Sequence, residues 1–440
     1  TRNISVTYPP RLGESLTRCP GLSSRRYGWR HGRVGVTKLR VLLVSPVAAL
    51  DPPGGDVTWT ESLLERPPAD VEYETYDEAM RRGALHEHGR RVGLRERIER
   101  LGHPGREGLL LAAGKLMTAA RRRNLLFWEP FRFFTVVPGE YDLIHMHVFS
   151  ARFVDVPCPL VVSNGGELAH LYRHARHMPE AQIRRRERAD RLLGRMLGVN
   201  VNSEYLPDAA RLMTYTEQAK LSFVRRGVFP ADRIDVVPLF LKPAPAVPRP
   251  TSPRRVGFVA RNFRDKGGPT LLEAWPKVRS ERPDAELLIV GCEPEIPPAE
   301  AARQGIRWEP YVPRAELLET VLPSIDVFAY PTNYDYVPSF IVLEVMTRGI
   351  PIAVSDHSAM PEVFDQGAAG LISPQGDAAA LAGNILRLLD PKENRRFGAA
   401  ARAQFERRFS SETVMPLIRA SYDRALALGP SGKVGPAQEG

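Results

Sequence analysis

The sequence predicts an α/β protein built from two doubly wound domains, each a parallel β-sheet with helices on both faces. Three observations lead to this prediction. Short apolar runs alternate with longer segments of helical periodicity, the alternation starts twice along the chain, and six prolines in residues 238–253 separate the two series. A chain of 440 residues is long enough for two full-sized cores.

We predict the domain boundaries from these changes along the chain. Residues 1–37 are polar and rich in arginine and glycine, and we expect them to be a disordered extension. The other predicted parts are the first domain at 38–238, a stiff linker at 239–253, the second domain at 254–410, a terminal helix at 411–428 that crosses back to the first domain, and a disordered tail at 429–440.

The composition is that of a soluble globular protein, with 43% hydrophobic and 25% charged residues. No apolar run reaches the roughly 18–20 residues that span a bilayer, and the first 37 residues lack the apolar segment of a secretory signal. Three widely spaced cysteines, Cys19, Cys158 and Cys292, favour a reducing compartment over a disulfide framework or a zinc site. We therefore expect a cytoplasmic protein.

The net charge of +10 permits three kinds of partner: nucleic acid, an anionic membrane face or phosphorylated substrates. No nucleic-acid recognition motif accompanies the charge, so that partner is not expected. Residues 79–134 are basic and end in an aromatic run from Phe127 to Phe134. Such a segment can lie on the inner, anionic face of a membrane, or it can pack on the sheet with its arginines reaching out to solvent.

In the first series, residues 38–46 predict a buried strand. Gly54 and Gly55 then predict a turn, and residues 58–64 predict a helix. This order is that of a mononucleotide-binding unit, although an ordinary strand-to-helix turn has the same pattern. Further strands are predicted at 141–148, which ends in His145 and His147, at 159–163, which leads into Asn164 and Gly165, and at 212–215 and 234–237, with a polar helix at 180–198.

In the second series, the loop after the first strand carries Arg261, Lys266, Gly267 and Gly268. Cations and glycines between a strand and a helix predict a cradle for a polyanion, and an exposed basic turn is the alternative. The predicted strands are 255–260, 285–291, 325–330, 350–354 and 370–373, and the predicted helices are 270–281, 315–322, 378–389 with Asp377 as its N-cap, and those over 392–428.

Residues 331–362 read as a strand end, a loop, a helix and another strand. Pro338 and Ser339 suit the first turn of that helix, and Gly349 with Pro351 ends it. Glu344 lies in the middle of this mostly apolar helix. It is either an exposed residue of an amphipathic helix or a ligand-binding carboxylate.

Together these motifs resemble the GT-B retaining glycosyltransferases of family 4. The loop from Ala260 to Gly267 matches the family's Gly-Arg-Leu-x3-Lys-Gly pattern, and Gly291 matches the glycine that ends its next strand. Glu344 to Ile352 matches the family's second glutamate followed by Ala-Met-x-x-Gly-x-Pro-Val, and Pro361-Glu362 matches its later Pro-Glu. The resemblance implies the GT-B fold, with two Rossmann-like domains facing a central cleft.

The resemblance also implies a donor site for a nucleoside-diphosphate sugar in the second domain and an acceptor site in the first. Arg261 and Lys266 would bind the diphosphate and stabilise charge on the leaving group. Glu344 would accept hydrogen bonds from the ribose. The remaining implied donor contacts are Gly54, Gly55, Gly291, Ser339 and Phe340, and no metal or cofactor is implied, in keeping with the absence of any Asp-x-Asp pair.

Two positions depart from the family pattern. Tyr336 stands where the family has its first glutamate, which contacts the sugar, and Asp335 is the nearest acid. The family's histidine after the strand at 159–163 is missing, so Asn164 and Gly165 occupy that segment. His145, His147 or His170 can substitute for it, although a single histidine is more often a core or surface residue.

The sequence therefore predicts transfer of a hexose-type sugar, with retention, to a hydroxyl group of a glycan, a lipid or a small molecule. Two alternatives remain at this point. One is a catalytically impaired GT-B protein that binds nucleotide or glycan, and the other is a sugar-nucleotide epimerase.

Overall fold

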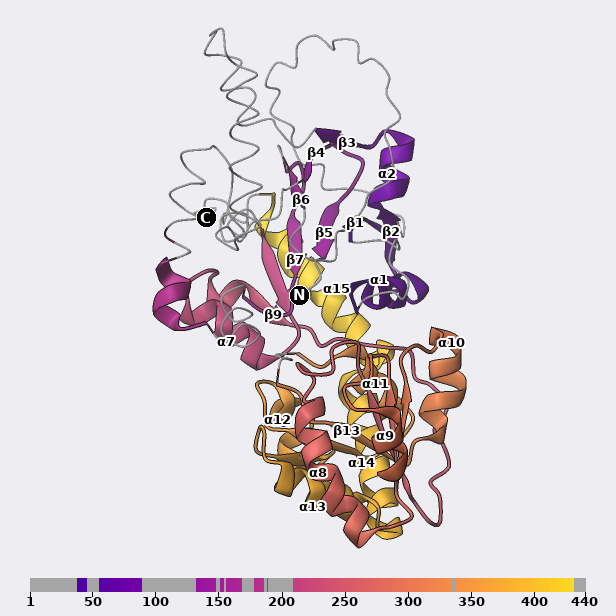
Figure 1. Cartoon of the computed structure of the whole chain (residues 1–440). Helices are drawn as coiled ribbons and strands as arrows, with labels where there is room; N and C mark the ends of the chain where they lie inside the picture. Colours follow the sequence, from indigo (N-terminus) through magenta and orange to yellow (C-terminus); the bar gives the residue numbers. More distant parts are fainter. Residues whose placement is uncertain are drawn as a thin grey trace, which may run out of the picture. The chain divides into compact units, whose positions relative to one another are not determined.

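The computed structural model describes residues 38–45, 55–88, 132–147, 151–153, 156–167, 178–185, 188, 209–333, 335 and 337–430. Two six-stranded parallel sheets with helices confirm the predicted fold class (Figure 1). Gly54, His170, Tyr336, the segment from 89 to 131 and the tail after residue 430 lie outside the described residues. In the part that is described, no helix is both long and apolar enough to cross a membrane.

The first sheet consists of six parallel strands. Alternate residues of its first strand join different core clusters, Val41 and Leu43 on one face and Leu42 and Val44 on the other. Because both faces are covered, the central strands read as continuous apolar runs. The strand order is β2 (Val71–Thr75), β1 (Leu39–Val44), β5 (Leu143–His147), β7 (Leu160–Ser163), β8 (Arg211–Thr214) and β9 (Ile234–Val236).

A smaller sheet of three strands accompanies the first sheet and was not predicted. Its strands are β3 (Leu85–His88), β4 (Arg132–Val136) and β6 (Ala151–Phe153). The first two pair antiparallel and the last two pair parallel.

The second sheet reverses its strand order between β10 and β13. The order is β12 (Ile306–Glu309), β11 (Glu286–Val290), β10 (Arg255–Val259), β13 (Val327–Tyr330), β14 (Ile352–Ser355) and β15 (Leu371–Ser373), all parallel. In open parallel sheets such a switch point marks where ligands bind, beyond the carboxyl ends of the strands. The loops that carry Arg261, Lys266 and Asp335 leave the carboxyl ends of β10 and β13.

Helices lie where they were predicted near 58–64, 270–281, 378–389 and 392–428. The helices Tyr76–Arg82, Glu217–Arg225 and Pro298–Arg303 were not predicted, and Gly55, predicted in a turn, is instead the first residue of a helix. The Asp377 side chain accepts a hydrogen bond of 2.9 Å from the Ala380 N–H, which confirms it as an N-cap. The helices are α1 (Gly55–Glu65), α2 (Tyr76–Arg82), α7 (Glu217–Arg225), α8 (Gly268–Glu281), α9 (Pro298–Arg303), α10 (Arg314–Glu316), α11 (Phe340–Thr347), α12 (Met360–Val363), α13 (Ala378–Leu388), α14 (Pro391–Arg408) and α15 (Ser411–Leu428). A π turn, η3 (Leu317–Val321), and a 3-10 turn, η4 (Leu322–Ser324), follow α10.

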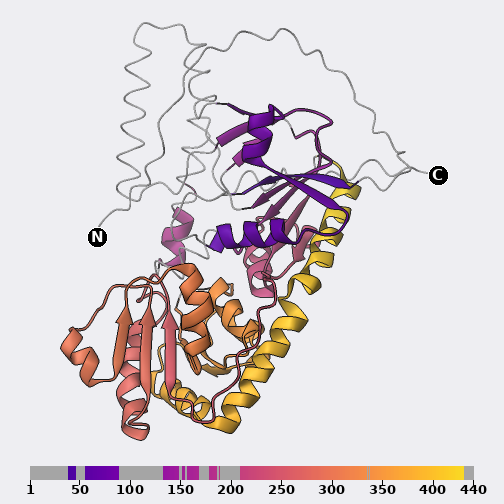
Figure 2. The ribbon, with the colours of Figure 1, turned by 90° about the vertical axis from the view of Figure 1, so that its right-hand side faces the viewer.

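Residues 239–253 lie against the helices of the second sheet. Leu239, Phe240 and Leu241 are buried, and the backbone of Leu241 bonds to Phe409 and Ser411, where α14 passes into α15. Helix α15 then packs on β7 and β8 of the first sheet (Figure 2). The chain thus passes twice between the two sheets, and the two passages are bonded to each other.

Candidate functional site

A glycine allows the loop between β10 and α8 to lie directly against the end of β13. Gly267 has a φ of 79°, and a Cβ atom there would lie 1.7 Å from the Pro331 carbonyl oxygen. The Asn333 N–H also donates to the Asp265 carbonyl, at 2.9 Å. Only glycine allows this approach, which brings the loops after the two switch-point strands together.

Lys266 lies in this junction, with its ammonium group paired to Asp335. Asp335 is buried, and its other carboxylate oxygen accepts hydrogen bonds from the Tyr330 hydroxyl at 2.6 Å and the Thr332 hydroxyl at 2.9 Å. The ammonium also lies 5.7 Å from the centre of the Tyr330 ring. Asp335 therefore faces Lys266 with both oxygens engaged. Tyr330 and Thr332 were not predicted as site residues, because their only signal in the sequence is their place at the carboxyl end of β13.

Gly291 lies beside Ala260, the residue that precedes Arg261. Arg261 is exposed and is the second residue after β10. Gly291 follows β11 with a φ of 90°, and a Cβ atom there would lie 3.1 Å from the Ala260 carbonyl oxygen. The Gly291 backbone is thus packed against the start of the Arg261 loop.

Glu344 is buried rather than exposed, with only 4% of its surface accessible. Its carboxylate accepts a hydrogen bond of 2.7 Å from Arg314, the first residue of α10. Burial raises the pKa of the Glu344 carboxyl, and the charge and hydrogen bond of Arg314 oppose that rise. Arg314 was not predicted as a site residue, because nothing in its local pattern indicates a partner 30 residues away.

Ser339 and Phe340 mark the start of α11. Ser339 is the N-cap residue, so the helix starts two residues after Pro338, later than predicted. The Ser339 hydroxyl lies 2.8 Å from that of Tyr330. A Cβ atom on Gly55 would lie 3.4 Å from the Phe340 ring, which places the first residue of α1 beside the start of α11.

The predicted contacts of the first sheet lie at the carboxyl ends of β5 and β7. His147 is 2% exposed, its ring stacks on Trp59 at 4.0 Å, and its Nδ1 lies 2.8 Å from the Ser163 hydroxyl. Asn164 and Gly165 form a half-buried turn that follows Ser163. The structure therefore brings His147, Asn164 and Gly165 together at adjacent strand ends.

His145 is fully buried, and its Nδ1 lies 2.6 Å from the Tyr422 hydroxyl of α15. Burial, with a contribution from His147, lowers the pKa of His145 to about 3. The ring is therefore neutral at physiological pH and serves to attach α15 to the first sheet.

We expect this histidine to make folding pH-dependent. Its pKa is lower in the folded than in the unfolded chain, so the unfolded state binds the proton first and stability falls as pH drops from about 6.5 towards 3. The expected slope is about 1.4 kcal/mol per pH unit. Urea unfolding between pH 7.5 and 5 measures it, and the slope is expected to shrink in His145→Asn but not in the exposed His86→Asn. Equal slopes in both variants would contradict this origin.

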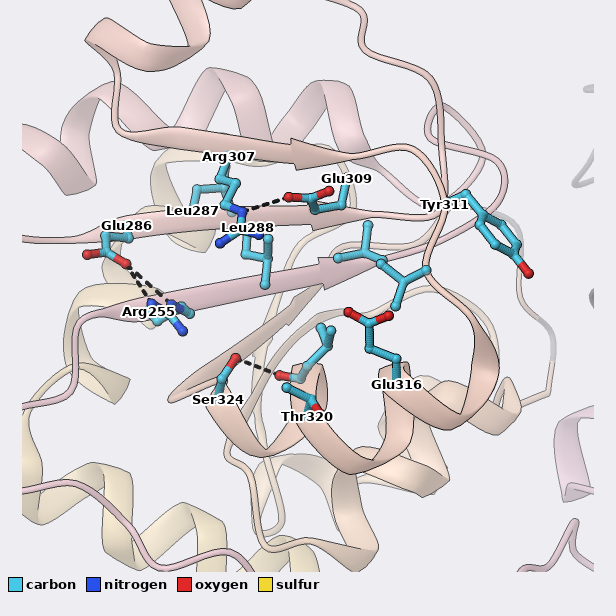
Figure 3. A pocket seen from close by; sticks show the side chains of 13 residues that line it. Arg255, Glu286, Leu287, Leu288, Arg307, Glu309, Tyr311, Glu316, Thr320 and Ser324 are labelled. Atoms are coloured by element: carbon cyan, nitrogen blue, oxygen red, sulfur yellow. Dashed lines mark hydrogen bonds and ion pairs between the residues drawn. The ribbon is translucent and has the colours of Figure 1, made fainter.

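A cavity of about 320 Å³ lies between β10–β12 and the segment from α10 to η4 (Figure 3). Leu288 and Val290 contribute to its wall, and the ion pairs Arg255–Glu286 and Arg307–Glu309 lie along the strands. None of the predicted site residues lines this cavity. Among the described residues, no group of three or more His, Cys, Asp or Glu side chains is arranged to hold a metal ion.

Comparison with known proteins gives a family match over the second sheet. Residues 253–391 match the family described as glycosyl transferases group 1. A phosphatidyl-myo-inositol mannosyltransferase of Mycobacterium leprae is 31% identical over 37% of this chain and 44% of its own length. An MMP alpha-(1->4)-mannosyltransferase of Mycolicibacterium hassiacum is 32% identical over 44% of this chain and 49% of its own length. The match thus spans less than half of each relative.

Solved structures extend the similarity of the fold to both sheets. A sucrose-phosphate synthase from Thermosynechococcus elongatus superposes with a TM-score of 0.57 and 17% identity, over 89% of this chain and all of that one. Anabaena HepE in complex with UDP and glucose gives a TM-score of 0.53 and 15% identity, over 88% of this chain and 99% of that one. The chain therefore has the GT-B fold, and its residues 253–391 match the glycosyl transferases group 1 family.

Proposed function

We propose that this chain is a retaining glycosyltransferase of family 4, which transfers a hexose-type sugar from a nucleoside-diphosphate donor to a hydroxyl acceptor. One observation carries the proposal. Arg261 and Lys266 lie at the switch point of the second sheet, ahead of the amino end of α8, and the buried carboxylate of Glu344 lies on α11 of the same half. Cations and a helix amino end suit a diphosphate, and a carboxylate suits the two hydroxyls of a ribose.

In the proposed reaction, Arg261 and Lys266 stabilise the negative charge that develops on the diphosphate as the bond to the sugar breaks. The dipole of α8 adds a fixed positive potential at its amino end. Because these groups are already in place, little reorganisation is needed in the transition state. No metal or cofactor is required in this scheme, and the nucleotide sugar is a substrate.

The surroundings of Asp335 favour a reaction without a carboxylate nucleophile. One Asp335 oxygen pairs with Lys266, and the other accepts hydrogen bonds from Tyr330 and Thr332. Both oxygens are therefore bonded within the loop junction. The acceptor hydroxyl then transfers its proton to the leaving phosphate on the same face of the sugar. This route retains the anomeric configuration.

The names of similar proteins guide the choice of substrates. One relative is named a GDP-mannose-dependent mannosyltransferase acting on a phosphatidylinositol mannoside, and one solved structure contains UDP and glucose. We therefore propose GDP-mannose and UDP-glucose as the first donors to test, with glycan, lipid-linked and small-molecule acceptors. A cytoplasmic location with peripheral membrane contact is part of the same proposal.

Calorimetric titration with UDP and GDP tests the donor site. Replacing Lys266 with alanine is expected to weaken binding about 10- to 100-fold, because a charge-assisted hydrogen bond contributes about 1.5–3 kcal/mol. Arg261→Ala is expected to have a similar effect. Lys277→Ala, on the exposed face of α8, is the matched control and should bind as the unchanged protein does. Lack of binding to any nucleoside diphosphate, or unchanged affinity in Lys266→Ala, would overturn the proposal.

A second candidate is a GT-B protein that binds a nucleotide sugar without turnover. The engagement of Asp335 within the loop junction favours it, because that carboxylate is then not available to the sugar. Release of nucleoside diphosphate from either donor, abolished in Arg261→Ala, would exclude this candidate. Binding without any release, across lipid and glycan acceptors, would favour it over transfer.

A further inference from the structure

We propose that Arg314 is a positioning residue, which holds the Glu344 carboxylate in the orientation and charge state that bind the ribose. The inference rests on the proposed function, because it assigns a role at the same nucleotide site. No sequence motif pointed to Arg314. It is identified by its contact with Glu344 across 30 residues of chain.

The contact joins two elements that are separate in the fold. Arg314 begins α10, directly after the loop that follows β12, and Glu344 lies in the middle of α11. The guanidinium nitrogen and the carboxylate oxygen are 2.7 Å apart. About a third of the Arg314 side chain is exposed, at 36%, against 6% of the Glu344 side chain. The pair therefore lies at the edge of the helix layer, with the carboxylate on the inner side.

Arg314 is the cation that reaches the carboxylate. The charged groups that face Glu344 are Arg314 from α10 and Arg348 from its own helix. The Arg348 guanidinium instead donates hydrogen bonds to two backbone carbonyls, that of Glu344 at 2.8 Å and that of Leu318 at 3.0 Å. Among the described residues, Arg314 thus provides the hydrogen bond to the side chain.

The pair matters because the carboxylate is buried. Burial raises the pKa of Glu344, and the positive charge of Arg314 opposes this more strongly than that of Arg348. Without Arg314, the carboxyl group takes up a proton at higher pH, as buried acids without a partner do. A neutral carboxyl group accepts hydrogen bonds from ribose hydroxyls more weakly than a carboxylate does.

The same pair adds a polar contact to a segment whose apolar side chains, Leu317, Leu318 and Val321, are only partly buried against the core. No residue of Arg314–Glu316 or of Leu317–Val321 is buried, and the segment continues as a π turn. Its bonds to α11 are those of Arg314 with Glu344 and of Arg348 with Leu318. Losing Arg314 therefore removes one of these two bonds as well as the partner of the carboxylate.

The test uses titration calorimetry with UDP and GDP, and with their 2′,3′-dideoxy analogues, from pH 5.5 to 8.5. In Arg314→Met we expect affinity for the ribonucleotide to fall about tenfold at pH 7 and to recover as pH rises. Affinity for the dideoxy analogue should stay the same, because it lacks the hydroxyls that Glu344 binds. Arg314→Lys should restore much of the affinity. In a Glu344→Gln background, Arg314→Met should cause no further loss.

Arg303→Met, on exposed α9, is the matched control and should leave all affinities unchanged. An equal loss for ribose and dideoxy ligands with an unshifted pH profile would show a merely structural role and overturn the inference. If Arg314→Met does not fold, Arg314→Lys still decides through its pH profile. Failure of the unchanged protein to bind any nucleoside diphosphate overturns the proposed function and this inference together. Normal binding without an Arg314 effect overturns the inference alone.

Discussion

Gly267→Ala is expected to destabilise the protein by about 3–5 kcal/mol, among the largest effects of any single methyl group in this chain. The added Cβ would lie 1.7 Å from the Pro331 carbonyl oxygen, so the loop and β13 must separate. The positive φ of Gly267 adds strain of its own. Urea unfolding followed by tryptophan fluorescence measures the change in the free energy of unfolding.

Gly376→Ala is the matched control for this substitution. Gly376 has nearly the same φ, 78°, but no described atom lies within 4 Å of the position of its Cβ. Backbone strain alone should cost about 1 kcal/mol. The difference between the two variants isolates the clash with Pro331. Equal destabilisation would show that the loop and β13 do not meet as described.

Asp235→Ala is expected to cost about 3–5 kcal/mol, because it leaves a buried arginine without its partner. Asp235 and Arg211 are 8% and 7% exposed. The carboxylate also accepts hydrogen bonds from Ser421 at 2.6 Å and pairs with Arg424 at 2.9 Å, both on α15. The substitution therefore removes a main attachment of α15 to the first sheet.

The pKa of Asp235 is lowered, since burial raises it but the bonds from Arg211 and Ser421 and the nearby charges outweigh that. Asp235 therefore contributes stability at pH values above its pKa in the unfolded chain. That contribution is lost as the pH falls through its lower pKa in the folded protein. Asp423→Ala, which removes an exposed pair with Arg419, should cost no more than about 1 kcal/mol. Chemical denaturation at pH 7 measures the free energy of unfolding of both variants. Equal losses in Asp235→Ala and Asp423→Ala would contradict a buried role for Asp235.

The sequence predicted the fold class because the central strands are buried on both faces. The strands β1 and β7 are short, mostly apolar runs, and β5, β7 and β8 are buried over their whole length. The strands that escaped prediction include β2 and β12, which lie at sheet edges and carry polar side chains such as those of VEYET and IRWE. An edge strand has no need of a continuous apolar run, so its pattern resembles that of a loop.

The candidate site was predicted in part. The glycines and cations of the Arg261–Gly268 loop, and Glu344 on an apolar helix, stood out from the local pattern, and the structure places them in the same half of the fold. Tyr330, Thr332 and Arg314 did not stand out. Each donates a hydrogen bond to a residue predicted from the sequence, Tyr330 and Thr332 to Asp335 and Arg314 to Glu344.

The sequence by itself determined the two α/β units, the glycine-rich basic loop, the position of Glu344 in its helix and the N-cap at Asp377. These depend on residue order over a few turns or strands. Tertiary structure decided that Glu344 is buried beside Arg314, that Asp335 pairs with Lys266, and that His145 is a neutral core residue bonded to α15. Burial and ion pairing are properties of three-dimensional neighbours, and here those neighbours lie 30, 69 and 277 residues apart along the chain.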